Sequence, residues 1–304
     1  MSVQFSIITP SFNRLKFIGK TIESVLNQTY PALEYIVVDA DSSDGTLDLL
    51  EKYKSNGSIK YLSEPDDGMY DAINKGFEMA AGDVIAYLNT DDIYLPWTLA
   101  TVASVFEKHP NTDVVFGDSV IVDLKSNKSF LNIRPSFHPL WLYAGNRIAQ
   151  PTLFLKRECF ISVGDFRNEV DLLADCEYWL RLVDKGYNFR KVNEFLAIEV
   201  NHEDTIRETK RDIVSKEKAY LIEKYSSRLS NTIKTSAVLK LKKMETLINY
   251  LQFVLKSNFM LRHGAWGNTI GALDISFRPL TLIRSKIDGK KRQVWKFNLG
   301  RLLE

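Results

Sequence analysis

Cysteine is scarce in this chain. Cys159 and Cys176 are the only two in 304 residues, too few for a disulfide framework or, without a cluster of histidines, for a zinc site. Long apolar runs are also missing. The longest candidate, residues 247–255, is interrupted by Asn249 and Gln252 and falls short of the ~20 residues that span a bilayer. The first five residues lack the basic start of a signal peptide. We therefore expect reduced cysteines, no spanning helix and a cytoplasmic location.

The chain is otherwise globular in composition, with 45% hydrophobic and 12% aromatic residues. Its net charge of +2 conceals an asymmetry. Residues 1–205 hold 19 Lys and Arg against 30 Asp and Glu, whereas residues 206–304 hold 21 against 8. An acidic body followed by a basic tail indicates two functional units, divided near residue 205.

Short apolar runs alternate with helical patterns along the first part of the chain. This alternation predicts βαβ units and an α/β fold with a mostly parallel sheet flanked by helices. Pro10 is expected to end the first strand. Strands are expected at residues 5–9, 34–38, 59–62 and 84–88, and helices at residues 15–27, 46–54 and 69–80.

Polar clusters follow each of these strands, at residues 9–14, 39–44, 64–68 and 89–92. Ligands of parallel α/β sheets bind beyond the carboxyl ends of the strands. The four clusters therefore predict one binding site at that edge.

The cluster Asn89-Thr90-Asp91-Asp92 carries the clearest chemistry. Adjacent carboxylates after a buried strand repel each other, and a hard divalent cation relieves that repulsion. We expect Mg²⁺ or Mn²⁺ on Asp91, with Asp92 in support. The alternative is an acidic turn that caps a helix at 96–108.

The other clusters have structural alternatives. Residues 9–14 suit a planar base or an ordinary turn in which Ser11 or Asn13 caps the next helix. Asp39 can accept from a base N–H, and Asp44 or Thr46 is expected to cap the second helix. Acidic residues such as those at 64–71 are common at helix starts. Their combination with Asn74 and Gly76 favours a functional role for this segment.

Several stretches together resemble the family 2 glycosyltransferases, which have the so-called GT-A fold. The resemblance covers residues 3–205. Each motif alone is moderately specific, whereas their order and spacing together are strongly specific. The matching stretches are residues 7–14, 37–46, 68–76 and 88–92, with Gln150-Pro151-Thr152 and residues 174–182 further on.

The resemblance implies a nucleotide-sugar donor, commonly a UDP-sugar, and a saccharide or lipid-linked acceptor. It implies that Asp39 holds the uracil between Pro10 and Phe12. Asp175 matches the base that deprotonates the acceptor in a direct, inverting displacement. The residues expected to contact the donor are Thr9, Pro10, Phe12, Asn13, Arg14, Asp39, Asp41, Asp67, Asn74, Asn89 and Thr90.

The sequence departs from the family pattern in two places. Asn89 replaces the first acid of the Asp-any-Asp motif, which leaves the metal mainly to Asp91. Ala40 stands where many members have Asp, and Asp41 offers partial compensation. The Gln-x-x-Arg-Trp motif of processive polysaccharide synthases is absent.

Other residues admit two interpretations. Asp175 and Glu177 could be an N-cap and a dipole partner. Arg147, Arg181 and His202 could meet the diphosphate, or be paired or at the surface. Trp141, Tyr143 and Trp179 could stack on an acceptor sugar, although Trp179 fits a buried core better.

The tail carries an amphipathic helical pattern at 238–255 and basic residues at 286–292. This suits an anionic membrane surface, reached through residues 230–304 on the inner face. The alternative is packing onto the body. Nucleic acid is not expected as a partner, because the body is acidic.

We therefore expect an inverting, metal-dependent glycosyltransferase of surface polysaccharide or glycolipid synthesis. Residues 1–95 form its nucleotide-binding half, residues 96–205 its acceptor half and residues 206–304 a basic helical extension. One alternative is a nucleotidyltransferase, but residues 9–14 lack the glycine-rich loop it needs. The other is a non-catalytic nucleotide-sugar-binding protein.

Overall fold

The computed structural model describes residues 2–134, 136–137, 142, 148–167, 169–203, 205 and 211–226. The expected helix at 238–255 and the basic residues at 286–292 lie outside this part. So do Trp141, Tyr143 and Arg147, so their predicted roles stay predictions.

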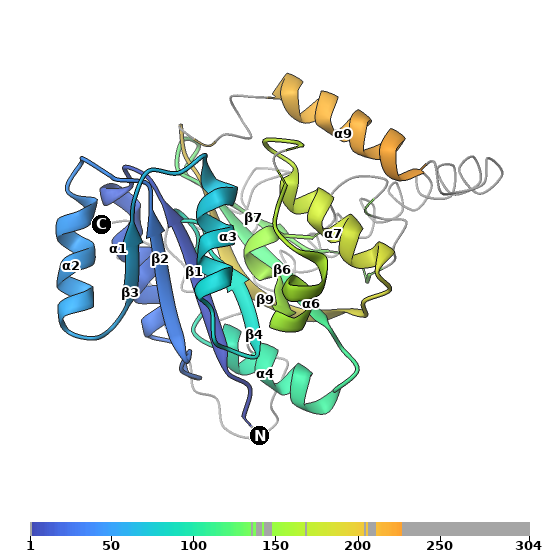
Figure 1. Ribbon diagram of the computed structural model, residues 1–304, viewed down its shortest axis with the longest axis horizontal. Coiled ribbons are helices and arrows are strands. Elements are labelled where there is room, and N and C mark those ends of the chain that lie inside the picture. Colours follow the sequence, from blue (N-terminus) through green and yellow to red (C-terminus); the bar gives the residue numbers. More distant parts are fainter. Residues whose placement is uncertain are drawn as a thin grey trace, which may run out of the picture.

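A nine-stranded sheet forms the centre of the molecule (Figure 1). Its strand order is β3-β2-β1-β4-β8-β6-β9-β5, with β7 paired to β6. The four strands at one side are parallel. They are β1 (Phe5–Ser11), β2 (Glu34–Asp39), β3 (Lys60–Ser63) and β4 (Val84–Tyr87).

The remaining strands form a mixed region: β8 runs antiparallel to β4 and β6, while β6 and β9 pair in parallel. The predicted α/β class with a sheet between helices is confirmed. The strands here are β5 (Ile93–Tyr94), β6 (Val114–Asp123), β7 (Lys128–Asn132), β8 (Phe154–Lys156) and β9 (Phe189–Asn201).

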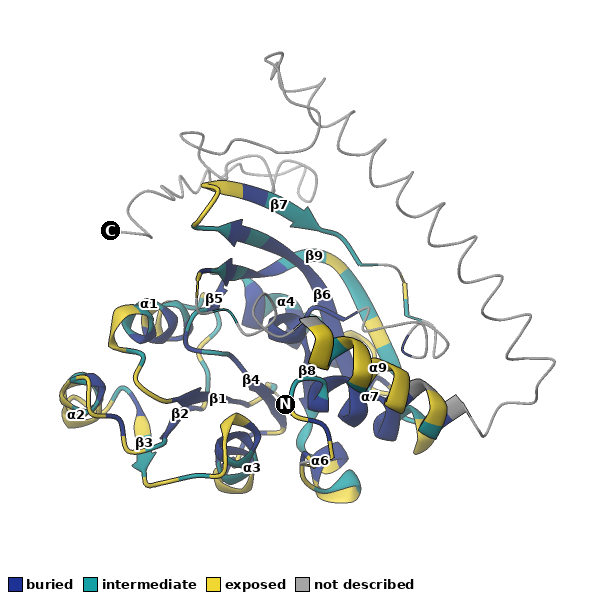
Figure 2. Ribbon diagram, turned by 90° about the horizontal axis from the view of Figure 1, so that it is seen from above, coloured by how far each residue is buried: buried dark blue, intermediate teal, exposed yellow. Residues whose placement is uncertain are grey.

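Two helical layers cover the sheet because neighbouring residues of its strands face opposite sides. Ile7 and Val37 join a core with α1 (Leu15–Leu26), α2 (Thr46–Ser55) and α4 (Thr98–Lys108). Ile8 and Val38 join the opposite core, with α3 (Met69–Met79), α6 (Arg157–Val163) and α7 (Ala174–Asp184). Figure 2 shows the two layers on either side of the strands.

The first strand does not end at Pro10, as the sequence suggested, but runs on to Ser11. The backbone groups of Ile8 and Pro10 face β4, whose pairing ends at Ile8, while those of Ser11 face β2. Pro10 therefore lies where a strand needs no N–H donor, so its ring does not interrupt the ladder.

The segment expected to begin the basic extension contains α9 (Arg211–Ser226), which packs on the body (Figure 2). Its side chains Leu221 and Tyr225 are buried in the same core as α7. Within the part of the chain that is described, no helix combines the length and apolarity needed to cross a bilayer.

Two helical glycines give a test of the packing between α3 and β1. A Cβ on Gly76 would lie 2.5 Å from a methyl carbon of Ile8, whereas one on Gly19 would meet its nearest neighbour, Leu49, at 3.7 Å. Gly76→Ala should destabilise the protein by about 1–3 kcal/mol through overpacking. Gly19→Ala should stabilise it by about 0.5–1 kcal/mol through helix propensity. Urea unfolding measures both, and equal stabilities would contradict the packing.

Candidate active site

A cavity of about 890 Å³ opens at the carboxyl ends of the parallel strands. Residues that follow β1, β2, β3 and β4 all reach its wall, as the four polar clusters predicted. Residues before α7, at the end of β9 and on α9 complete it. The predicted site residues on this wall are Pro10, Phe12, Arg14, Asp67, Asn89, Thr90, Asp91, Asp92 and Asp175.

Asp39 does not lie on the wall. Its side chain is fully buried, and its two oxygens accept the backbone N–H and the hydroxyl of Ser42 at 2.8 and 2.7 Å. The carboxylate thus fixes the loop after β2 below the cavity. Because this side chain has no exposed surface, it does not reach the cavity in this structure.

Three other residues that were predicted to contact the sugar donor do not face the cavity. Their side chains form hydrogen bonds with backbone groups instead. The hydroxyl of Thr9 donates to the Leu88 carbonyl at 2.8 Å. Asn13 accepts the backbone N–H of Ser43 at 2.9 Å. The amide of Asn74 donates to the Phe166 carbonyl at 3.0 Å and accepts its N–H at 2.8 Å. Their main role in this structure is to join segments.

The last residue that was predicted to contact the sugar donor and lies outside the wall is Asp41, in the loop after β2. Asp41 is exposed, with a positive φ of 58°. Asp44 accepts the backbone N–H groups of Leu15 and Thr46, at the starts of α1 and α2. Asp44 thus has a structural role, as expected, but the N-cap of α2 is Gly45 and no side chain forms a cap hydrogen bond there, so the expectation that Asp44 or Thr46 caps this helix is wrong.

The acidic turn after β4 brings Asp91 next to His202. Its Oδ2 lies 2.9 Å from Nε2 of His202, whose ring stacks on Phe17 with centroids 4.5 Å apart. His202 follows β9 and is buried, so the possibility of a surface loop histidine is wrong. Asp92 is buried too and accepts the backbone N–H of Val200 at 3.3 Å. Neither carboxylate caps α4, because β5 intervenes.

Asp91 and His202 offer a carboxylate oxygen and an imidazole nitrogen, two kinds of metal ligand. In this structure the two atoms lie at hydrogen-bond distance, 2.9 Å, so an ion held between them would replace that hydrogen bond. Across the described residues, no group of three or more His, Cys, Asp or Glu side chains is placed to hold a metal. An ion here would need phosphate or water oxygens to complete its shell.

Asn89 reaches the same space with an amide. Its Nδ2 donates to Oε1 of Gln150 at 3.3 Å, and Gln150 in turn donates to the Tyr87 carbonyl at 2.9 Å. The Oδ1 of Asn89 is buried without a protein partner. An unpartnered buried carbonyl is costly, so this oxygen is suited to accept from a ligand hydroxyl.

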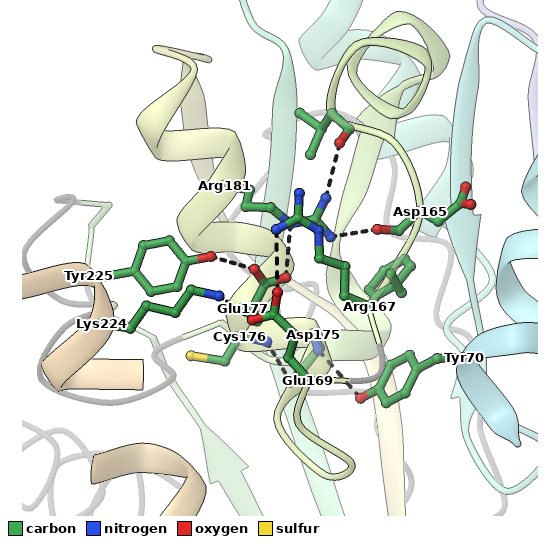
Figure 3. A network of polar contacts seen from close by, with 12 residues as sticks. Tyr70, Asp165, Arg167, Glu169, Asp175, Cys176, Glu177, Arg181, Lys224 and Tyr225 are labelled. Carbon is green, nitrogen blue, oxygen red and sulfur yellow. Dashed lines mark hydrogen bonds and ion pairs between the residues drawn. The ribbon is translucent and has the colours of Figure 1, made fainter. Parts of the chain in front are cut away.

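Asp175 lies on the cavity wall in the first turn of α7. Its side chain is 5% exposed, and its Oδ1 accepts the N–H of Cys176. Two residues on, Glu177 is fully buried and forms a 2.8 Å ion pair with Arg181 (Figure 3). Arg181 is therefore a paired arginine and not a phosphate contact. Trp179 lies in the core, as expected.

The cavity wall is acidic. Among the described residues that line it, seven are carboxylates and Arg14 is the only Lys or Arg. Burial, reinforced by Asp71 and Asp39, raises the pKa of Asp66 above its ordinary value, although Gly68 donates to it. Asp66 lies in the predicted cluster 64–68, but the sequence analysis missed Asp171 and Glu199 as wall residues, because no local pattern marks the strand end of β9 or the approach to α7 as facing the cavity.

Known proteins resemble this chain in sequence. A mycobacterial protein, "PGL/p-HBAD biosynthesis glycosyltransferase" of Mycobacterium bovis, is 29% identical over 58% of this chain and 68% of its own length. "Putative teichuronic acid biosynthesis glycosyltransferase TuaG" of Bacillus subtilis is 31% identical over 63% of this chain and 77% of its own.

Solved structures share the fold at lower identity. S. aureus TarS 1–349, in complex with UDP-GlcNAc, has a TM-score of 0.58 at 18% identity, over 77% of this chain and 70% of that one. The mannosyltransferase PcManGT of Pyrobaculum calidifontis, with GDP-Man and Mn²⁺, has a TM-score of 0.56 at 16% identity, over 86% and 81%. This chain spans 44% of a longer TarS chain.

Residues 6–164, more than half of the chain, match the family described as "Glycosyl transferase family 2". With the α/β sheet between two helical layers and the strand-end cavity, this match shows that the chain is a glycosyltransferase of family 2, with a GT-A fold.

Proposed function

We propose that this enzyme transfers a sugar from a UDP-sugar to a hydroxyl of a saccharide or lipid-linked acceptor, with inversion. The setting proposed is synthesis of a surface polysaccharide or glycolipid, in line with the names of the mycobacterial relative (PGL/p-HBAD biosynthesis) and the Bacillus relative (teichuronic acid biosynthesis). The observation that carries the proposal is the pairing of His202 with Asp91, which lies on the same cavity wall as Asp175.

The carboxylates of the acidic wall would repel the negative charges of a diphosphate. With Arg14 as the sole Lys or Arg among the described wall residues, the side chains seen here cannot balance a pyrophosphate. Mg²⁺ or Mn²⁺ held by Asp91 and His202 would offset the charge of the leaving nucleoside diphosphate. Asp92, already bound to the backbone of Val200, supports the turn.

The remaining wall residues divide between donor and acceptor. Phe12, which is 58% exposed, and Pro10 lie at the end of β1, where they can contact the base. The unpartnered oxygen of Asn89 accepts from a donor hydroxyl. Asp175 takes the proton of the acceptor hydroxyl as that oxygen attacks the anomeric carbon from the face opposite the leaving group.

A thermal-shift panel of UDP- and GDP-sugars with and without Mn²⁺ tests the donor and the ion together. We expect UDP-sugars to raise Tm, with most of the rise dependent on Mn²⁺. Asp91→Asn and His202→Ala should each remove the Mn²⁺-dependent part. His109→Ala, an exposed histidine outside the cavity, is the matched control. A full Mn²⁺ effect in both site variants would place the ion elsewhere.

Asp175→Asn tests the base. The amide cannot take up the proton, so kcat should fall at least about 100-fold, while calorimetry should show unchanged affinity for UDP with Mn²⁺. Asp171→Asn, an exposed acid on the same wall, should retain nearly full activity. Turnover that survives Asp175→Asn contradicts the assignment, and nucleotide binding without any turnover in the wild type favours a binding protein.

Substitutions of Asn89 and Asn74 distinguish a residue that contacts the ligand from one that stabilises the fold. Asn89→Ala removes the unpartnered oxygen together with the 3.3 Å bond to Gln150, and it should weaken UDP-sugar binding about tenfold with a smaller loss of stability than Asn74→Ala. Asn74→Ala removes both bonds to Phe166 and should lower the free energy of unfolding by about 1–3 kcal/mol. Its UDP-sugar affinity should stay near the wild-type value. Titration calorimetry and urea unfolding on both variants would reveal the opposite pattern if the roles are reversed.

A further inference from the structure

Helix α9 provides an unusual cap for the segment that leads to the proposed base. The carboxylate of Glu217 accepts three consecutive backbone N–H groups, those of Asp171 at 2.8 Å and of Leu172 and Leu173 at 3.0 Å. Leu173 is the N-cap residue of α7, and Asp175 follows two residues later. Glu217 therefore fixes the backbone at the point where the chain enters the helix that carries Asp175.

Further contacts hold α9 against the same part of α7. The hydroxyl of Tyr225 donates to Glu177, which also pairs with Arg181, and Lys224 pairs with Glu169 (Figure 3). Leu221 is buried between these ends. Residues 217, 221 and 225 are four apart and share one face of α9, so the helix contacts α7 along two turns.

The same helix reaches the cavity, because Val214 forms part of its wall. The sequence analysis assigned these residues to a basic extension and left open whether it packs on the body. The contacts of α9 fall on residues 169–173 and Glu177, around the start of α7. A helix with only a packing role would not need a carboxylate directed at the three N–H groups that precede the site.

We propose that Glu217 is a positioning residue for the transfer reaction, which sets the location of Asp175 by fixing residues 171–173. This inference rests on the proposed role of Asp175 as base. Hydrogen bonds from three N–H groups to an ionised carboxylate are strong, and a misplacement of about 1 Å at a reacting group can cost about 100-fold in rate.

The test compares Glu217→Ala and Glu217→Gln with Glu223→Gln, an exposed glutamate on the same helix. In Glu217→Ala, kcat for UDP-sugar turnover with Mn²⁺ should fall about 10- to 100-fold, with the donor KM within about twofold. Glu217→Gln keeps one acceptor oxygen, so its kcat should lie between those of Glu217→Ala and the wild type. The kcat of Glu223→Gln should match that of the wild type. Thermal melts establish that each variant is folded at the assay temperature.

Hydrogen exchange gives a readout that does not depend on activity. The amides of residues 171–173 should exchange about tenfold faster in Glu217→Ala than in the wild type, and those in β1 should not change. Faster exchange with an unchanged kcat would reduce Glu217 to a structural contact and overturn the proposal, as would a loss of rate explained by donor KM alone. A wild type that turns over no sugar nucleotide removes the proposed function itself, while the exchange data still report the Glu217 contact.

Discussion

The gathering of seven carboxylates around one cavity is the constraint on which the arrangement of this site depends, because like charges brought together repel each other. Several of these carboxylates accept a hydrogen bond from another segment or from a nearby N–H group. Asp91 lies against His202, and Asp66 accepts from Gly68. Backbone N–H groups serve Asp92 and Asp175, and Ser119 and Asn132 donate to Glu199. These contacts thus stabilise the acidic wall, and such a wall suits a substrate that binds together with cations.

Most of these donors come from distant parts of the chain, so the site depends on the register of the sheet. Asp91 follows β4 and His202 follows β9, strands that are separated by β8 and β6 in the sheet. A slip in the pairing of β6 with β9 would turn the residues around His202 to the other face. The regular pairing of β6 with β9 from Ser119 and Ala197 onward therefore matters for the chemistry as well as for stability.

The sequence predicted the parallel strands and the strand-end cavity, because alternation of apolar residues and polar strand ends are local signals. It also predicted a structural role for Asp44, although not as a helix cap, and the burial of Trp179. It did not distinguish Asn74, which holds Phe166, from Asn89, which faces the cavity: both are polar residues in family-like motifs, and only tertiary contacts separate them. The same limit applies to His202 and to Glu217, whose partners lie 111 and 44 to 46 residues away.

The neighbourhood of Asn89 gives a physical reason for its departure from the family pattern. Nδ2 of Asn89 donates to Oε1 of Gln150, whose own Nε2 is engaged by the Tyr87 carbonyl. A carboxylate at position 89 would face that oxygen with no proton to give, and it would add an eighth negative charge to the wall. The amide avoids both penalties and still offers an unpartnered carbonyl to the cavity. Asn89 thus leaves Asp91 and Asp92 as the charged groups of this turn, with the Asp91 carboxylate held against His202.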